Sequence, residues 1–233
     1  MGDKAGIFLI TYNFLDLTKA CLESLKKATA YPYKLLVVEN NSTDATLAYL
    51  NSMGITTIAS QRALSISEAI NIGMQRFMAD PEIGYIAWIH NDMLFYQGWL
   101  ANLIQVLKQN PDIGKISPYN FQGPPEQYND VIAAKFMSDN RDKCYPAHGG
   151  PWVMRKEVVA DVGYFDEGYG DCGGYEDWDY NNRLLAKGYR VMISWSSVVW
   201  HPGMGTRKHL DTRAAAVKNA SRYTSKWGKG PRV

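Results

Sequence analysis

Short apolar runs bounded by polar residues recur through the first half of the chain. They cover residues 7–10, 35–38, 85–89 and 113–117, with a weaker run at 56–58. Continuous runs of this length are typical of strands that are buried on both faces of a sheet. We therefore predict a strand at each of these positions.

Between the runs, apolar residues return at helical spacing. Leu17, Cys21, Leu25 and Ala28 form one such stripe, and Asp16 is the N-cap expected for it. Further helices are expected from Thr43 or Asp44 onward, over 66–77 and over 99–107. This alternation of strand and helix predicts an α/β fold with right-handed crossovers and a mostly parallel sheet flanked by helices on both faces.

The character of the sequence changes after residue 117. Residues 118–150 are rich in Pro, Gly and Asn, and we predict an irregular seam there between two halves that share one sheet. Beyond the seam, Gly163 and Gly188 are expected to end two helices. The predicted helices cover 153–161, 177–187 and 208–226, and the predicted strands cover 189–193 and 198–200.

Composition narrows the class of protein. The chain has 233 residues, of which 46% are hydrophobic and 21% charged, and this composition excludes a disordered protein. Its net charge of +2 gives no strong positive potential that would attract nucleic acid. No apolar run approaches the roughly 18 residues of a membrane span, and the N-terminus has no signal-peptide pattern. Three widely separated cysteines without a Cys-x-x-Cys pair favour free thiols and a cytoplasmic location.

The C-terminal tail is basic. From Met204 onward it carries eight Lys and Arg side chains against one Asp, whereas the first 203 residues carry 17 basic and 22 acidic side chains. Such a tail can contact phosphates or, peripherally, an anionic membrane surface. The alternative is an ordinary solvated helix face.

Polar side chains follow three of the predicted strands directly. The carboxyl ends of parallel strands meet at one edge, where open α/β sheets bind ligands. The residues at these ends are Thr11, Tyr12 and Asn13 after the first strand, Glu39 after the second, and His90, Asn91 and Asp92 after the fourth.

The glycine-rich phosphate motifs of other nucleotide-binding folds are missing. The sequence has no Gly-x-x-x-x-Gly-Lys-Ser/Thr, no Gly-x-Gly-x-x-Gly after the first strand and no Gly-x-Ser-x-Gly. Kinases, GTPases, dinucleotide dehydrogenases and α/β-hydrolases are therefore disfavoured. A pyrophosphate bound here would need a divalent cation, for which Asp92 is the first candidate ligand. The alternative for Asp92 is a turn or helix-cap residue.

Seven segments in order resemble glycosyltransferase family 2, the inverting nucleotide-sugar transferases with the GT-A fold. They are Thr11-Tyr12-Asn13, VVENNSTDAT (37–46), INIGM (70–74), IHNDMLFYQGWL (89–100), GGPWVMRKEVVADVGYFDEGY (149–169), GGYEDWDYNNRLLAKGYRV (173–191) and VVWHPGMGT (198–206). The resemblance implies a donor-binding half over 1–117, an acceptor-binding and catalytic half over 118–206, and a basic tail over 207–233.

The resemblance also assigns roles to the residues at the strand ends. It implies a nucleoside-diphosphate-sugar donor and a divalent cation, Mn²⁺ or Mg²⁺, held by Asp92 and His201. Glu39 matches the carboxylate that holds the base, and Asn71 would lie near the ribose or sugar. The remaining residues implied on the donor side are Thr11, Tyr12, Asn13, His90 and Asn91.

Asp177 matches the catalytic base of the family, and Glu176 and Asp179 would support it or touch the acceptor. That acceptor would be a hydroxyl of a glycan or of a lipid-linked saccharide. A base that takes the hydroxyl proton during attack implies inversion at the anomeric carbon. The sequence departs from the family pattern at His90, which replaces the first Asp of Asp-x-Asp, and at Glu39, which replaces the commoner Asp.

Other interpretations of these residues stay open. His201 could be a core histidine, and Asp177 could be a helix cap. At the level of function, the alternatives are a catalytically reduced binding module for sugar nucleotides or polysaccharides, motivated by His90, and a nucleotidyltransferase. The latter is disfavoured because it would need a basic glycine-rich loop near the first strand.

Overall fold

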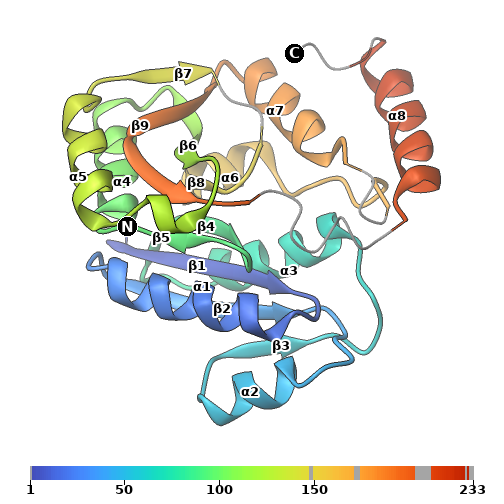
Figure 1. Ribbon diagram of the computed structural model, residues 1–233. Helices are drawn as coiled ribbons and strands as arrows, with labels where there is room; N and C mark the ends of the chain where they lie inside the picture. The colour runs from blue at the N-terminus through green and yellow to red at the C-terminus, as the bar shows by residue number, and fades with distance from the viewer. Residues whose placement is uncertain (1, 147–148, 171–173, 203–210, 229, 231–233) are drawn as a thin grey trace.

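A single mixed sheet runs through both halves of the protein (Figure 1). The computed structural model describes residues 2–146, 149–170, 174–202, 211–228 and 230. Its strands are β1 (Lys4–Thr11), β2 (Tyr33–Glu39), β3 (Thr57–Ala59), β4 (Ile83–His90), β5 (Leu94–Phe95), β6 (Ile113–Phe121), β7 (Cys144–Pro146), β8 (Trp152–Arg155) and β9 (Arg190–Trp200). Its helices are α1 (Leu15–Ala28), α2 (Thr46–Ser52), α3 (Ile66–Met78), α4 (Trp99–Gln109), the short 3₁₀ helix η1 (Pro125–Gln127), α5 (Asp130–Asp139), α6 (Lys156–Val162), α7 (Glu176–Ala186) and α8 (Arg213–Trp227).

Most strands of the sheet run in one direction. The order is β3-β2-β1-β4-β8-β6-β9-β5, with β7 paired to β9. Strands β1 to β4 pair in parallel, as do β6 and β9. The antiparallel strand β8 lies between β4 and β6, so β6 keeps the direction of β4. The predicted α/β class is confirmed, and the sheet is mixed because β5, β7 and β8 oppose the rest.

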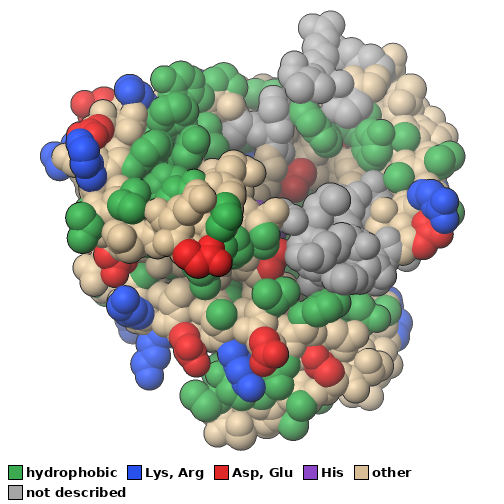
Figure 2. Space-filling view, in the orientation of Figure 1, with side chains coloured by type: hydrophobic (Ala, Val, Ile, Leu, Met, Phe, Trp, Pro, Cys, Tyr) green, Lys and Arg blue, Asp and Glu red, His purple; other side chains and the backbone are tan. Residues whose placement is uncertain are grey.

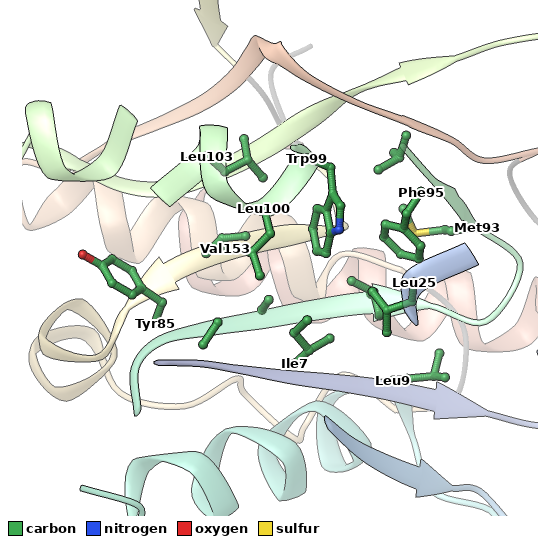
Figure 3. Close-up of a cluster of buried hydrophobic side chains, with 14 of the residues drawn as sticks. Ile7, Leu9, Leu25, Tyr85, Met93, Phe95, Trp99, Leu100, Leu103 and Val153 are labelled. Atoms are coloured by element: carbon green, nitrogen blue, oxygen red, sulfur yellow. The ribbon is translucent and has the colours of Figure 1, made fainter. Parts of the chain in front are cut away.

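Alternate side chains of the central strands enter two cores on opposite faces of the sheet. Ile7 and Leu9 of β1 join the core covered by α1 and α4, part of which Figure 3 shows around Trp99. Phe8, between them, belongs to the core covered by α3, α6 and α7. This period of two explains why the strands appear as unbroken apolar runs: both faces are buried.

Two predicted elements of the second half differ from the structure. The helix expected over 153–161 begins only at Lys156, because Trp152–Arg155 forms β8 between β4 and β6. The seam expected to be irregular contains α5, whose N-cap Asn129 accepts hydrogen bonds from the backbone N–H groups of Val131 and Ile132. The prediction that Gly163 and Gly188 end two helices is confirmed, and their φ values are 86° and 85°.

The start of the first helix is also different from the prediction. Asp16 lies inside the first turn of α1, and Phe14 in the left-handed region is the N-cap residue. The capping carboxylate comes from another loop: Asp44 accepts the backbone N–H of Leu15 at 3.2 Å and that of Thr46 at 2.9 Å. One side chain therefore satisfies the first turns of both α1 and α2.

In the described part of the basic tail, residues 213–227 form α8, which lies beside α7 (Figure 1). Of its basic residues, Arg207, Lys208, Lys229 and Arg232 lie outside the described residues, as does Cys172. Cys21 and Cys144 are free thiols. None of the described helices combines the length and apolar composition that a bilayer crossing requires.

Candidate active site

The polar residues predicted at the strand ends do meet at one edge of the sheet. Strands β1, β2 and β4 end at Thr11, Glu39 and His90. Thr11 lies in register with Glu39, and Ile10 lies in register with His90. His201 follows the end of β9, which runs in the same direction. The middle of the surface in Figure 2 is hollowed, with acidic side chains visible inside the recess.

Three side chains from this edge converge on one point. The Nε2 atom of His201 lies 3.0 Å from Oδ1 of Asp92 and 3.1 Å from Nδ1 of His90. One ligand atom from each of the three residues lies within 4.8 Å of the others. The sequence predicted Asp92 and His201 as the metal ligands, and the structure adds His90, which the sequence had suggested only as a departure from the family motif.

The chemistry of this cluster fits a divalent cation. Burial and the neighbouring His201 lower the pKa of His90 to about 3, so its ring is neutral at physiological pH and keeps a nitrogen lone pair. Neutral imidazole nitrogens together with a carboxylate oxygen suit Mn²⁺ and related first-row ions. Asp92 is buried and the two histidines are partly buried, which limits competition from water.

Packing fixes the ring of His90. The Trp88 ring lies 4.6 Å from it, centroid to centroid. Behind both rings is the backbone of Gly150, where an added Cβ would lie 2.7 Å from the Trp88 ring and 3.3 Å from Nε2 of His90. Only a residue without a side chain therefore fits at position 150, because the two rings occupy the space of a Cβ.

The residues predicted to hold the nucleoside form a connected group after β1 and β2. Glu39 is buried, and one of its carboxylate oxygens accepts the backbone N–H of Ser42 at 2.7 Å. Asn13 accepts hydrogen bonds from the backbone of the same loop, at Thr43. The Thr11 hydroxyl is fully buried and has no protein partner among the described residues. Tyr12 lies between Thr11 and Asn13 and is half-buried.

Two asparagines predicted on the donor side bond to the protein itself. The side-chain amide of Asn71 donates to the carbonyl of Phe165 at 3.0 Å and to the carboxylate of Glu167 at 2.8 Å, while its oxygen accepts the Phe165 N–H. Asn91 donates to the Thr18 hydroxyl at 3.2 Å. Direct contact of either residue with a donor stays a prediction.

The predicted catalytic base lies in the first turn of α7. The N-cap residue is Tyr175, at φ 77°, so Asp177 is inside the helix and the cap interpretation is excluded. Glu176 and Asp177 are half-buried, and the positive end of the helix dipole stabilises carboxylates at this position. The Asp177 carboxylate lies 3.3 Å from Nζ of Lys115, a residue of β6 that is fully buried. The only sequence signal for Lys115 was a charge inside an apolar strand.

Asp179 is bound entirely within the protein. Its buried carboxylate accepts from Arg183 at 3.1 Å and from the Trp227 indole at 2.9 Å, and Lys226 pairs with it at 2.7 Å. Tyr169 completes the set at 3.3 Å. A role for Asp179 at the acceptor stays a prediction; what the structure shows is a link between α7 and α8.

The sequence over most of the chain matches the family model for glycosyl transferase family 2, across residues 6–163. The chain belongs to glycosyltransferase family 2. The resemblance to this family is thereby confirmed, and the protein is a glycosyltransferase enzyme. The matched residues include the first four of the seven segments and most of the fifth, and they end before the last two. Gly203, Gly205 and Thr206, which belong to the last of those segments, lie outside the described residues.

Relatives of this glycosyltransferase are distant. It is 24% identical over 239 residues to the uncharacterized glycosyltransferase YwdF of Bacillus subtilis, covering 97% of this chain and 85% of that one. GalNAc-T7, solved with UDP, GalNAc and Mn²⁺, superposes with a TM-score of 0.75 at 14% identity, covering 96% of this chain and 48% of its own. The mannosyltransferase PcManGT of Pyrobaculum calidifontis, solved with GDP-Man and Mn²⁺, superposes with a TM-score of 0.69 at 18% identity. The match covers 99% of this chain and 66% of the PcManGT chain.

These structures establish the GT-A fold for the chain. The chain spans about half the length of the GalNAc-T7 chain and 66% of the mannosyltransferase chain.

Proposed function

We propose that this glycosyltransferase moves a sugar, with inversion, from a nucleoside-diphosphate-sugar to a hydroxyl of a glycan or lipid-linked saccharide, in a metal-dependent reaction. The observation that carries the proposal is the convergence of His90, Asp92 and His201 at the carboxyl edge of the sheet. Two proteins of the same fold, GalNAc-T7 and PcManGT, were solved as complexes with a nucleotide or nucleotide-sugar and Mn²⁺, which supports the same chemistry here.

The metal ligands come from both proposed halves of the chain. His90 and Asp92 belong to the donor-binding half, residues 1–117, and His201 belongs to the acceptor-binding half, residues 118–206. A bound Mn²⁺ or Mg²⁺ would supply positive charge for the departing diphosphate. The two histidines and Asp92 would hold this ion, and the group after β1 and β2, Glu39 with its loop, would receive the nucleoside.

Asp177 acts on the acceptor. Its carboxylate takes the proton of the acceptor hydroxyl as the hydroxyl oxygen attacks the anomeric carbon. The bond from that carbon to the phosphate oxygen breaks, and the diphosphate leaves with the electron pair. Attack opposite the leaving group gives inversion, and general-base assistance of this kind contributes roughly 10²–10⁴-fold.

The cell location and the tail belong to the proposal as well. We place the enzyme in the cytoplasm, with free Cys21 and Cys144 as the support. Arg222 and Lys226 of α8 are paired with Asp166 at 2.8 and 3.1 Å, so these two cations are directed at the protein. Peripheral contact with an anionic surface would rest on the other basic residues of the tail.

The test begins with binding and ends with product. A thermal-shift screen against UDP-, GDP-, TDP- and CMP-sugars, each with and without Mn²⁺, identifies the donor through the rise in melting temperature. His201→Ala should lose the Mn²⁺-dependent part of that rise. Asp177→Asn should keep it but lose transfer by orders of magnitude, and the product from wild type should show inverted configuration by NMR.

Asp16→Asn is the matched control, because its carboxylate is 99% exposed on α1. It should bind and transfer like wild type. Binding without turnover on any acceptor would instead identify a reduced binding module, and pyrophosphate release from a nucleoside triphosphate and a sugar phosphate would identify a nucleotidyltransferase. Transfer by Asp177→Asn at the wild-type rate would remove the proposed base.

A further inference from the structure

Lys115 is a lysine with no exposed surface, in the interior strand β6. Its neighbours across the sheet are Met154 of β8 and Val191 of β9. Transfer of an ammonium group into such surroundings is costly unless a counter-charge and hydrogen bonds compensate. Burial accordingly lowers the pKa of Lys115, and the nearby carboxylates oppose that shift.

The compensating charge is at the start of α7. Nζ of Lys115 lies 3.3 Å from Oδ1 of Asp177. In the described part of the chain, the charged groups around this ammonium are Asp177 and the adjacent Glu176, both in the first turn of α7. The Asp177 side chain is itself 19% exposed, so it reaches from the buried ammonium to solvent.

We infer that Lys115 is a positioning residue that holds the Asp177 carboxylate in one orientation. This inference rests on the proposed role of Asp177 as the base. A base must be deprotonated before the acceptor arrives, and an ammonium group at this distance favours the charged carboxylate. The contact to Oδ1 also fixes the side chain, so that one geometry is presented to the acceptor hydroxyl.

The pair offers a pH-dependent readout. An ammonium group favours the ionised form of a carboxylate that it contacts. Removal of the ammonium should therefore shift the acid limb of the pH profile to higher pH. A residue that only fills space in the core would leave that limb unchanged.

Lys115→Met is the main test, since methionine preserves the length of the stem, and apolar replacement of a buried charge is often tolerated. Thermal unfolding confirms that the variant is folded. ¹³C NMR titration of labelled aspartate carboxyls, with the Asp177 signal assigned by its loss in Asp177→Asn, measures the group without any substrate. The Asp177 midpoint should be higher in Lys115→Met than in wild type, because the neighbouring cation is gone.

Kinetics supply the second readout once a donor is found. In Lys115→Met the acid limb of kcat should move up in parallel with the NMR midpoint, kcat should fall roughly tenfold or more, and KM for the donor should stay within about twofold. Lys115→Arg, which retains a cation, should keep the Asp177 midpoint of the wild type. Lys4→Met is the matched control, because Lys4 pairs with Glu82 at the start of β1, the opposite edge of the sheet from the site.

The outcomes separate the two proposals. Equal Asp177 midpoints in wild type and Lys115→Met would overturn the positioning role, whatever the activity. If Asp177→Asn transfers normally, the base assignment fails, and the inference about Lys115 fails with it. A shifted midpoint with an inactive Asp177→Asn supports both. If Lys115→Met does not fold, the same titration compares Lys115→Arg, which keeps the positive charge, with Lys115→Gln, which lacks it.

Discussion

The carboxylate of Asp179 accepts a hydrogen bond from the indole N–H of Trp227 at 2.9 Å, which joins the start of α7 to the end of α8. Asp179 lies two residues after Asp177, so the basic tail is bound directly behind the proposed base. Asn219 adds a second link, because its amide donates to the carbonyls of Gly170 and Gly174, shortly before α7. The tail is therefore part of the framework that holds the first turn of α7.

Asp179→Ala should destabilise the protein by about 1–3 kcal/mol, because Arg183 and the Trp227 indole lose a fully buried acceptor, whereas Lys226 keeps Asp166 as a partner. Chemical denaturation measures this change. Asp211→Ala is the control, since Asp211 also pairs with an arginine but is 66% exposed, and it should cost little. An Asp179→Ala protein as stable as wild type would show that α8 is held by other contacts.

The sheet and its binding edge could be predicted from the sequence because they depend on local patterns. Buried strands appear as short apolar runs, and polar residues at their ends mark the ligand edge. One prediction that failed concerns long-range pairing. Residues 153–155 are apolar and suit either a helix or a strand, and only the gap between β4 and β6 decides that they form β8.

The site was partly predictable for the same reason. Asp92 and His201 stood out through the family motifs. The contribution of His90 depends on its contact with His201, which follows β9, and no sequence spacing reveals that contact. Lys115 gave a weak signal as a charge in an apolar run. Its partner Asp177 is 62 residues away, so the pair became visible only in the structure.

Stability should fall in acid through the capping box of α3. The Glu68 carboxylate accepts hydrogen bonds from Arg62 and from the backbone of Ser65, which lower the pKa of Glu68 to about 2. Because the folded pKa lies below the ordinary value of 4.5, this stabilisation is complete above about pH 4.5 and is lost as pH falls toward 2.

Glu68→Gln should remove that part of the pH dependence, as measured by urea unfolding at pH 3, 4 and 6. Relative to wild type, the variant should be less stable at pH 6, and the difference should narrow at pH 3. Glu126→Gln, in the exposed 3₁₀ helix η1, is the control. A difference that stays constant with pH would contradict the assignment.

Asn71 should contribute mainly to stability. Asn71→Ala leaves the buried N–H and carbonyl of Phe165 without their partner, which costs about 1–3 kcal/mol. Asn51→Ala, on the exposed face of α2, should change little. Denaturant unfolding measures the stability, and donor titration measures binding. A loss of donor affinity at unchanged stability would instead place Asn71 against the ribose or sugar.

Gly150 should be essential for the metal site. In Gly150→Ala the new Cβ would lie 2.7 Å from the Trp88 ring, so this ring must move, and His90 packs against it. Displacement of a group that orients a ligand typically costs 10–100-fold in metal affinity. Titration with Mn²⁺ alone measures the effect. Gly149→Ala is a matched control, because no atom of the described residues lies within 4 Å of the Cβ that it would add.

His90 should determine which ion the enzyme prefers. Two imidazoles and one carboxylate favour first-row transition ions such as Mn²⁺ and Co²⁺ over Mg²⁺, which prefers oxygen ligands. His90→Asp restores an Asp-x-Asp sequence and replaces a nitrogen by oxygen. The ratio of the Mg²⁺ to the Mn²⁺ dissociation constant should then fall by about tenfold, or about 1.4 kcal/mol.

Calorimetry with each metal, in the wild type and the variant, gives this ratio. His90→Asn separates charge from ligand type: it also offers oxygen but adds no negative charge, so its ratio should fall less than that of His90→Asp. A ratio that is the same in all three proteins would mean that His90 does not touch the ion. The metal would then be held by Asp92 and His201 alone, and the 3.1 Å contact between the two histidine rings would serve only to orient His201.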